Sequence, residues 1–299
     1  MGSSFHPTGV LVPLVTPFDE HERVDLDSLA TLAESVLDAG ARGIVALATT
    51  GEPTSLDEAE RDAVVATCAE VCGRRGALLV VGAGTNDTRT TIARHEALGA
   101  VPGVDASMAV VPYYVRPSES AIVEHFRTVA AHSPVPVIAY NIPYRTGRGL
   151  GADALLALAA TENVAGVKQA VDGIDRDTLR VLAEAGDDFA MLGGDDPFLF
   201  PLVLMGGKGA IAASSHLCTR RFVEMIDCGL RGDVQQGRRQ AEALLPLVRA
   251  LFAEPSPAVI KAALHARGQI PTASVRMPLA AASADAAAAA EQALRVLEA

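Results

Sequence analysis

One lysine in this sequence is a candidate nucleophile because of its position. Lys168 ends a short apolar run, residues 164–168, of the kind that forms a strand buried on both faces. Enzymes built on parallel strands carry their reacting side chains at the carboxyl ends of those strands. Burial disfavours a charged ammonium group, so a lysine there can present the neutral amine that attacks a ketone to form a Schiff base. The alternative is a lysine whose stem is buried and whose ammonium reaches water.

Hydroxyl groups at two other predicted strand ends favour the catalytic interpretation of Lys168. Tyr140 ends the preceding run, and its phenol can move protons to and from a carbinolamine. Thr49 and Thr50 follow an earlier run and precede a Gly-Glu pair; hydroxyls and backbone N–H groups at such a turn suit a small carboxylate. Taken alone, this motif is more typical of an ordinary turn and helix cap.

Two further loops contain candidate substrate contacts. Arg145 follows the strand that ends at Tyr140, and its planar guanidinium can hold a second carboxylate through two hydrogen bonds. The alternative is a solvated surface arginine. Gly194 belongs to a Gly-Gly-Asp-Asp motif that can present backbone carbonyls to a substrate, or simply turn the chain and cap a helix.

The segments that position these residues alternate between apolar runs and stretches of helical period. The runs are residues 10–15, 43–48, 77–82, 106–111, 135–140, 164–168, 189–192 and 210–213. Asp25, Asp57 and Ser118 precede helical stretches, where their side chains can accept bonds from free N–H groups. The predicted helix stops are Gly40, Gly73 and Gly186.

Eight such units predict an α/β fold, a closed (β/α)8 TIM barrel. A doubly wound sheet also alternates, but the first predicted strand lacks the Gly-x-Gly-x-x-Gly turn of a dinucleotide-binding fold. After the eighth run only helices are expected, at residues 234–251, 256–266 and 284–298. We therefore expect a catalytic barrel over residues 1–232 and a C-terminal helical extension over residues 233–299, which can pack on the barrel or form an oligomer interface.

Composition and charge exclude several classes of protein. The 299 residues include 25 Lys and Arg against 36 Asp and Glu, a net charge of −11 that argues against binding nucleic acid or an anionic membrane. The 49% hydrophobic fraction supplies a large core. No secretory signal or membrane-spanning run is recognisable, which predicts a cytoplasmic protein.

The four cysteines do not form a recognisable metal motif. Cys68 and Cys72 share one face of a predicted helix, but no His or Cys cluster nearby completes a tetrahedral set. They are typical of small core residues in a reducing compartment. We expect no metal site and no dissociable cofactor.

An ordered set of motifs resembles the dihydrodipicolinate synthase and N-acetylneuraminate lyase family of lysine-dependent pyruvate aldolases. In chain order the motifs are GVLVPLVTPF from Gly9, Thr49-Thr50-Gly51-Glu52, Val111-Pro112-Tyr113-Tyr114, Tyr140-Asn141-Ile142-Pro143, Gly166-Val167-Lys168, Gly194-Asp195-Asp196, Glu254-Pro255-Ser256-Pro257 with Lys261, and Val275-Arg276-Met277-Pro278. The Arg-Thr-Gly that begins at Arg145 is typical of the synthase branch, and sialic acid lyases lack that arginine.

The resemblance also implies roles for individual residues. It places Thr49, Tyr140 and Tyr114 in a proton relay, with Tyr114 crossing from a neighbouring subunit of a homo-oligomer, a dimer of dimers. Otherwise a Tyr-Tyr pair in a loop is more typical of packing at a rim. Gly194 and Ile211 are the remaining substrate-binding candidates that it implies.

Three positions depart from the family pattern. Ala48 stands where glycine is usual, and its methyl group can narrow the pocket or shift the turn. Gln169 follows the lysine where glutamate is common, which removes a charge near Lys168, and Pro53 replaces a small residue. These departures leave imine chemistry intact and bear on the second substrate.

The resemblance implies condensation of pyruvate with L-aspartate 4-semialdehyde to 4-hydroxy-tetrahydrodipicolinate, a step of lysine and diaminopimelate biosynthesis, through a Schiff base on Lys168. One alternative is a related lyase or dehydratase whose partner aldehyde derives from a sugar acid or is aromatic. The other is a non-catalytic barrel that binds a small carboxylate; a buried amine at a strand end argues against it.

The resemblance bears on feedback inhibition by lysine as well. Lysine-inhibited members offer a His, Asn and Glu set, whereas the matching positions here are Arg61, Asn86 and Thr90. A cationic arginine and a missing acid disfavour a cationic ligand, so we expect weak or absent inhibition by lysine.

Overall fold

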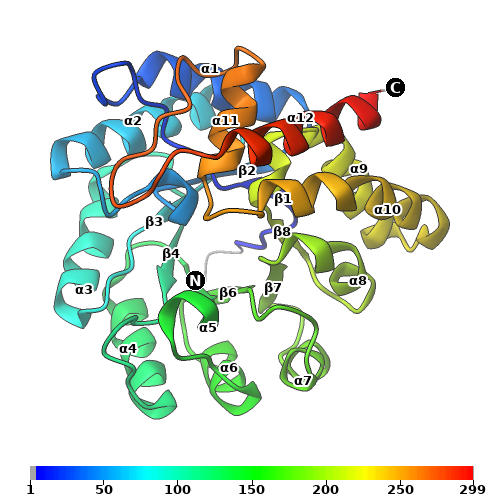
Figure 1. The fold of residues 1–299 in the computed structure, drawn as a ribbon. Helices are drawn as coiled ribbons and strands as arrows, with labels where there is room; N and C mark the ends of the chain where they lie inside the picture. The colour runs from blue at the N-terminus through cyan, green and yellow to red at the C-terminus, as the bar shows by residue number, and fades with distance from the viewer. Residues whose placement is uncertain (1–4, 299) are drawn as a thin grey trace.

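The computed structural model describes residues 5–298, in which eight parallel strands close into a barrel in chain order (Figure 1). This confirms the predicted fold class. The strands are β1 (Gly9–Val12), β2 (Gly43–Ala46), β3 (Leu78–Gly82), β4 (Ala106–Val110), β5 (Val137–Asn141), β6 (Val164–Gln169), β7 (Ala190–Gly193) and β8 (Gly209–Ile211). Each predicted run overlaps one of them, with small differences at the ends, because a strand buried on both faces needs apolar residues at successive positions.

Helices surround the barrel. They are α1 (Leu26–Asp38), α2 (Glu58–Arg75), α3 (Thr88–Ala97), α4 (Glu119–His132), α5 (Pro143–Thr146), α6 (Ala152–Ala159), α7 (Arg176–Glu184), α8 (Leu199–Leu204), α9 (Thr219–Arg231), α10 (Val234–Leu251), α11 (Ala258–Ala266) and α12 (Ala284–Glu298). The three predicted caps are confirmed, since Asp25, Asp57 and Ser118 each accept a bond from a backbone N–H of the first turn.

One predicted helix stop is wrong. Gly73 lies inside α2, and the helix ends instead at Gly76, whose φ of +60° is the left-handed conformation that glycine adopts without strain. The two arginines between these glycines, Arg74 and Arg75, form ion pairs with acids of α1. The extra turn therefore joins α2 to its neighbour.

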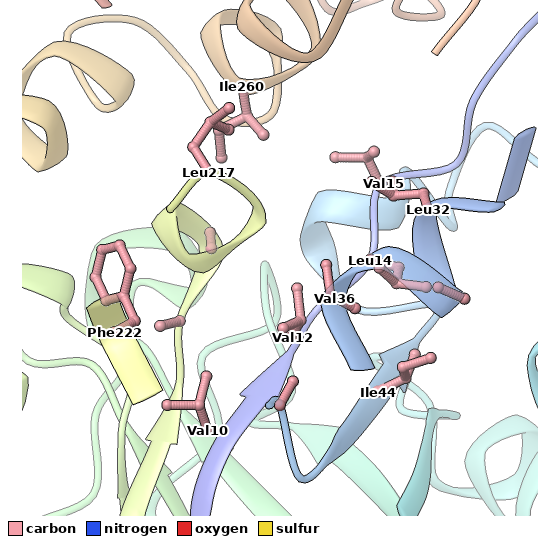
Figure 2. Packing of buried hydrophobic residues seen from close by; sticks show 14 of the residues in the cluster. Val10, Val12, Leu14, Val15, Leu32, Val36, Ile44, Leu217, Phe222 and Ile260 are labelled. Carbon is pink, nitrogen blue, oxygen red and sulfur yellow. The ribbon is translucent and has the colours of Figure 1, made fainter. Parts of the chain in front are cut away.

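The core is divided between the inside of the barrel and the layer between strands and helices. Figure 2 shows the second part, in which Val10 and Val12 of β1 pack with Val36 of α1 and Phe222 of α9. Ile260 of α11 belongs to the same buried cluster, so the C-terminal helices share a core with the barrel. Packing of α10 against α9 and α12 continues this layer. The division of the chain at residue 232 stays a prediction.

A buried histidine joins two loops at the carboxyl end of the barrel. Nε2 of His216 accepts a bond from the backbone N–H of Val15 (3.0 Å), and Nδ1–H donates to the carbonyl of Ala213 (2.7 Å). Both bonds require the neutral ring in this tautomer. Burial lowers the pKa of His216 to about 4 from its usual 6.5.

We expect His216 to make the protein sensitive to acid. Above pH 6.5 the imidazole is neutral in both folded and unfolded chains, whereas between about 6.5 and 4 only the unfolded chain takes up the proton. Acidification over this range should therefore lower the free energy of unfolding, by about 3 kcal/mol from His216. Urea titrations at pH 7 and pH 4 measure the loss. It should be smaller in His216→Gln and unchanged in the exposed control His132→Gln; an equal loss in all three proteins would contradict the assignment.

Candidate active site

Lys168 and Tyr140 are direct neighbours in the barrel wall. They face each other in the register of β6 and β5, and only 6% and 5% of their surfaces are exposed. The Lys168 Nζ atom lies 4.3 Å from the centre of the Tyr140 ring. Tyr140 belongs to the apolar cluster inside the barrel, so its neighbour across the ladder, Lys168, points to the same side. The structure thus brings a buried amine and a phenol together, as the sequence predicts.

Two other predicted residues surround this pair. The backbone N–H of Gly194 donates to the carbonyl of Gln169, and a Cβ atom at Gly194 would lie 2.9 Å from Cε of Lys168. A side chain at position 194 would therefore displace the lysine. Ile211, at the end of β8, is fully buried in the same interior cluster as Tyr140. These positions fit substrate-binding roles, which stay predictions.

The turn that contains Thr49 and Thr50 is a single turn of 3-10 helix, Thr49–Gly51. The hydroxyl of Thr50 donates to the carbonyl of Pro13, so its proton is not free for a substrate. Within residues 5–298, the backbone N–H groups of Thr49 and Thr50 have no protein acceptor. The structure therefore offers a carboxylate the amides of this turn and the Thr49 hydroxyl rather than both hydroxyls.

The same turn is anchored by a buried ion pair. Oε1 of Glu52 lies 2.7 Å from Nζ of Lys261, which comes 209 residues later on α11, and their side chains are 1% and 0% exposed. Oε2 of Glu52 accepts a bond from the backbone N–H of Arg276 (2.8 Å). Burial lowers the pKa of Lys261 to about 8, and the charge of Glu52 opposes that shift. These residues appear in the sequence motifs, but nothing in a single sequence shows that they touch.

Asn141 positions the loop that contains Arg145. Its side-chain amide donates to the carbonyl of Leu150 (3.3 Å) and accepts from the Leu150 backbone N–H (3.1 Å). Arg145 lies on the short helix α5 within this loop, and its exposed guanidinium has no carboxylate partner among residues 5–298. It is therefore available to an anionic group of a substrate.

Gln169 does not face Lys168. Its side-chain oxygen accepts from Nδ2 of Asn141 (3.0 Å), and its nitrogen donates to the hydroxyl of Thr178 on α7 (3.0 Å). Successive residues of a strand point to opposite sides, so Gln169 lies outside the barrel wall while Lys168 lies inside. This corrects the expectation that the glutamine changes the charge beside the lysine. The period of two in the strand was the signal that could have shown it.

A cavity of about 570 Å³ opens beside these residues, and Thr49, Tyr140 and Arg145 line it. Lys168 lies next to the cavity, because its Nζ atom contacts the Tyr140 ring and that ring lines the cavity. Ala48 and Pro53 also line the cavity, so two of the three departures from the family pattern lie where a substrate would bind.

Two carboxyl groups near Lys168 were not predicted from the sequence to take part in the chemistry of the site. Asp195 and Asp196 were expected to expose backbone carbonyls or to cap a helix, but Asp195 makes no side-chain cap bond. Burial raises the pKa of both carboxyl groups, and the charge of Lys168 opposes the shift. One oxygen of Asp196 accepts from the backbone N–H of Ser214 (2.6 Å). The acidic doublet after a predicted strand was the available signal.

Tyr114 lies apart from this group. It is 87% exposed, with φ of +70°, in the loop after β4, whereas its neighbour Tyr113 lines the cavity. The proton relay through Tyr114 stays a prediction for an assembly of subunits.

The described residues add two findings on other classes of site. Among residues 5–298, no helix is long and apolar enough to cross a membrane. The same part of the chain holds no group of three His, Cys, Asp or Glu side chains placed to bind a metal ion.

The fold and the site together define a (β/α)8 barrel that holds a buried lysine amine at the carboxyl end of a strand, the position where barrel enzymes carry their reacting groups. A family model described as the dihydrodipicolinate synthetase family matches residues 6–297. The chain belongs to this family.

Individual relatives agree over nearly the whole chain. The 4-hydroxy-tetrahydrodipicolinate synthase of Moorella thermoacetica is 38% identical over 270 residues, 90% of this chain and 91% of the relative. The crystal structure of dihydrodipicolinate synthase from Thermotoga maritima matches with a TM-score of 0.94 and 30% identity, over 98% of this chain and 99% of that one. A chloride-inhibited dihydrodipicolinate synthase from Acinetobacter baumannii, complexed with pyruvate, gives a TM-score of 0.93 and 30% identity, over 97% and 99% of the two chains.

Proposed function

We propose that this protein condenses pyruvate with L-aspartate 4-semialdehyde to form 4-hydroxy-tetrahydrodipicolinate, in lysine and diaminopimelate biosynthesis. The observation that carries the proposal is the buried Lys168 amine against the Tyr140 ring, in a chain of the dihydrodipicolinate synthetase family. Relatives bear the name of the corresponding synthase, and one related structure contains pyruvate.

The geometry supports a sequence of four steps. The neutral Lys168 amine adds to C2 of pyruvate, whose carboxylate rests on the amides of Thr49 and Thr50. Tyr140 transfers protons as the carbinolamine loses water and becomes an imine. Loss of a methyl proton gives an enamine, whose carbon forms a bond to the aldehyde carbon of the semialdehyde. The amine of the adduct then attacks the imine carbon, which closes the ring and releases Lys168. Imine formation replaces direct deprotonation of pyruvate with easier steps.

Borohydride trapping combined with a turnover assay tests this proposal. Pyruvate and borohydride should add one reduced pyruvate to the intact protein, and a coupled assay should detect condensation with aspartate semialdehyde. Labelling without turnover would exclude this aldehyde and leave the imine chemistry. The absence of both would contradict the proposal and favour a barrel that only binds carboxylates.

Arg145 is expected to hold the carboxylate of the semialdehyde. Replacing it with lysine keeps the charge but removes the planar fork that holds a carboxylate through two bonds. We expect Arg145→Lys to raise the KM for the semialdehyde about tenfold or more, with the KM for pyruvate nearly unchanged. Steady-state kinetics with each substrate varied in turn measure both values. An equal rise in both would show that Arg145 does not discriminate between the two sites.

The proposal includes an assembly, a compartment and the absence of a cofactor. We infer a homo-oligomer, a dimer of dimers, in which the exposed Tyr114 reaches the site of a neighbouring subunit and completes a relay with Thr49 and Tyr140. The imine on Lys168 supplies the electron sink, so the reaction needs no dissociable cofactor or metal. The acidic net charge of −11 fits a cytoplasmic enzyme of small substrates that binds neither nucleic acid nor membrane.

A different aldehyde partner is the second candidate function. Ala48 and Pro53 favour it because both line the cavity beside Thr49 and depart from the family pattern. Sugar-derived and aromatic aldehydes offered to the unreduced enzyme together with pyruvate test it: turnover of one of them faster than of aspartate semialdehyde would establish the alternative.

A further inference from the structure

The lining of the cavity has a charge opposite to that of the protein as a whole. The charged side chains that line it are Arg61, Arg94, Arg145 and Asp87. Three cations against one anion is unusual in a chain with a net charge of −11. A local excess of positive charge in an acidic protein attracts small anions selectively.

Arg61 and Arg94 form the part of this surface that the proposed reaction does not use. Arg61 lies in the first turns of α2 and Arg94 lies on the neighbouring helix α3, and both are partly buried. Neither has a carboxylate partner or a side-chain hydrogen bond in the described part of the chain, whereas Arg74 and Arg276 each pair with a glutamate. The pKa of Arg61 is lowered by burial and then by the positive charge of Arg94. An anion bound between these two partly buried guanidinium groups would offset their repulsion.

Neighbouring groups complete a set of donors. The side-chain amide of Asn86, with no hydrogen-bond partner within residues 5–298, and the phenol of Tyr113 line the same cavity. Asp87 is the acidic residue of this lining. Its carboxylate repels a bound anion less strongly, because it already accepts bonds from the backbone N–H and the hydroxyl of Thr90. Each guanidinium presents a planar fork of donors that matches two oxygens of a carboxylate or phosphate.

We propose that Arg61 and Arg94 form a binding site for a small multivalent anion, a dicarboxylate or a phosphate compound, separate from the imine site on Lys168. Because Arg61 and Arg94 line the same cavity as Thr49 and Tyr140, an anion held by the two arginines lies next to the path of the substrates and changes their binding. This inference goes beyond the proposed reaction. It concerns a ligand that is not a substrate.

Direct binding measurements test the site without any need for turnover. Isothermal titration with inorganic phosphate and with succinate, at constant ionic strength and constant chloride, should give saturable binding in the millimolar range or tighter. Arg61→Gln and Arg94→Gln should each weaken it about tenfold or more, because each removes a charge-assisted pair of bonds. Arg239→Gln is the matched control, since it removes the same charge from an exposed arginine of α10. The relative affinities of phosphate and succinate distinguish the two sources of anion.

Three outcomes would overturn the proposal. One is the absence of saturable binding by either anion, and the second is equal affinity in Arg61→Gln, Arg94→Gln and the control. The third is loss of binding in Arg145→Gln with full binding in Arg61→Gln, which would place the anion on the substrate's carboxylate site. Borohydride labelling by pyruvate should persist in Arg61→Gln, so failure of this site and failure of the Lys168 chemistry are distinguishable.

The same site accounts for the expected response to lysine. L-lysine carries a net positive charge, so the two arginines should repel it and the enzyme should show no inhibition at sub-millimolar lysine. Half-inhibition in that range would contradict both the anion site and the expectation drawn from Arg61, Asn86 and Thr90.

Discussion

Replacing Lys168 with alanine should abolish both the borohydride label and turnover. The chain contains three lysines, Lys168, Lys208 and Lys261, so the assignment of a label is unusually clear. Lys261 is fully buried in its pair with Glu52, and Lys208 pairs with Asp187. Without the amine no imine or enamine forms, and we expect kcat to fall by roughly four orders of magnitude or more. Intact-protein mass spectrometry and the coupled assay measure the two losses.

Lys208→Ala is the control for this experiment. It removes a lysine from the surface at the start of β8 and should keep both the label and the turnover. A label that persists in Lys168→Ala and disappears in Lys208→Ala would refute the proposed nucleophile. Circular dichroism of each variant separates loss of the amine from loss of the fold.

The second large effect concerns the buried pair of Glu52 and Lys261. Glu52→Gln leaves the Lys261 ammonium buried without a counterion, which should lower the free energy of unfolding by about 3–5 kcal/mol. It also loosens the turn that presents Thr49 and Thr50, so we expect a higher KM for pyruvate. Urea denaturation measures the first effect and steady-state kinetics the second. An exposed pair gives the comparison: Asp187→Asn should leave the stability nearly unchanged.

A double variant separates stability from positioning. Glu52→Gln combined with Lys261→Met replaces the pair with groups that need no counterion, and such replacements are often neutral for stability. Recovered stability with a KM for pyruvate that stays raised would show that Glu52 positions the turn. If stability and KM both return to the wild-type values, the pair contributes only to stability and the positioning role is wrong.

The sequence alone determined the architecture and identified the candidate reacting residues. Strands buried on both faces require continuous apolar runs, and helices require a period of 3.6 with capping residues, so eight strand segments and the caps Asp25, Asp57 and Ser118 are visible in local patterns. Lys168 and Tyr140 could be predicted as site residues because each ends such an apolar run. Their contact across the ladder needed only the order of neighbouring strands in a barrel.

The tertiary structure decided what depends on side-chain direction and on contacts between distant segments. Whether the Thr50 hydroxyl faces a substrate or the carbonyl of Pro13 depends on a strand end 37 residues away. The pairing of Glu52 with Lys261 joins residues 209 positions apart, and Arg61 and Arg94 line one cavity although they lie on different helices. Local patterns record which residues are apolar and in what period. They do not record which polar atoms from distant segments come within bonding distance, because packing of the whole chain sets those distances.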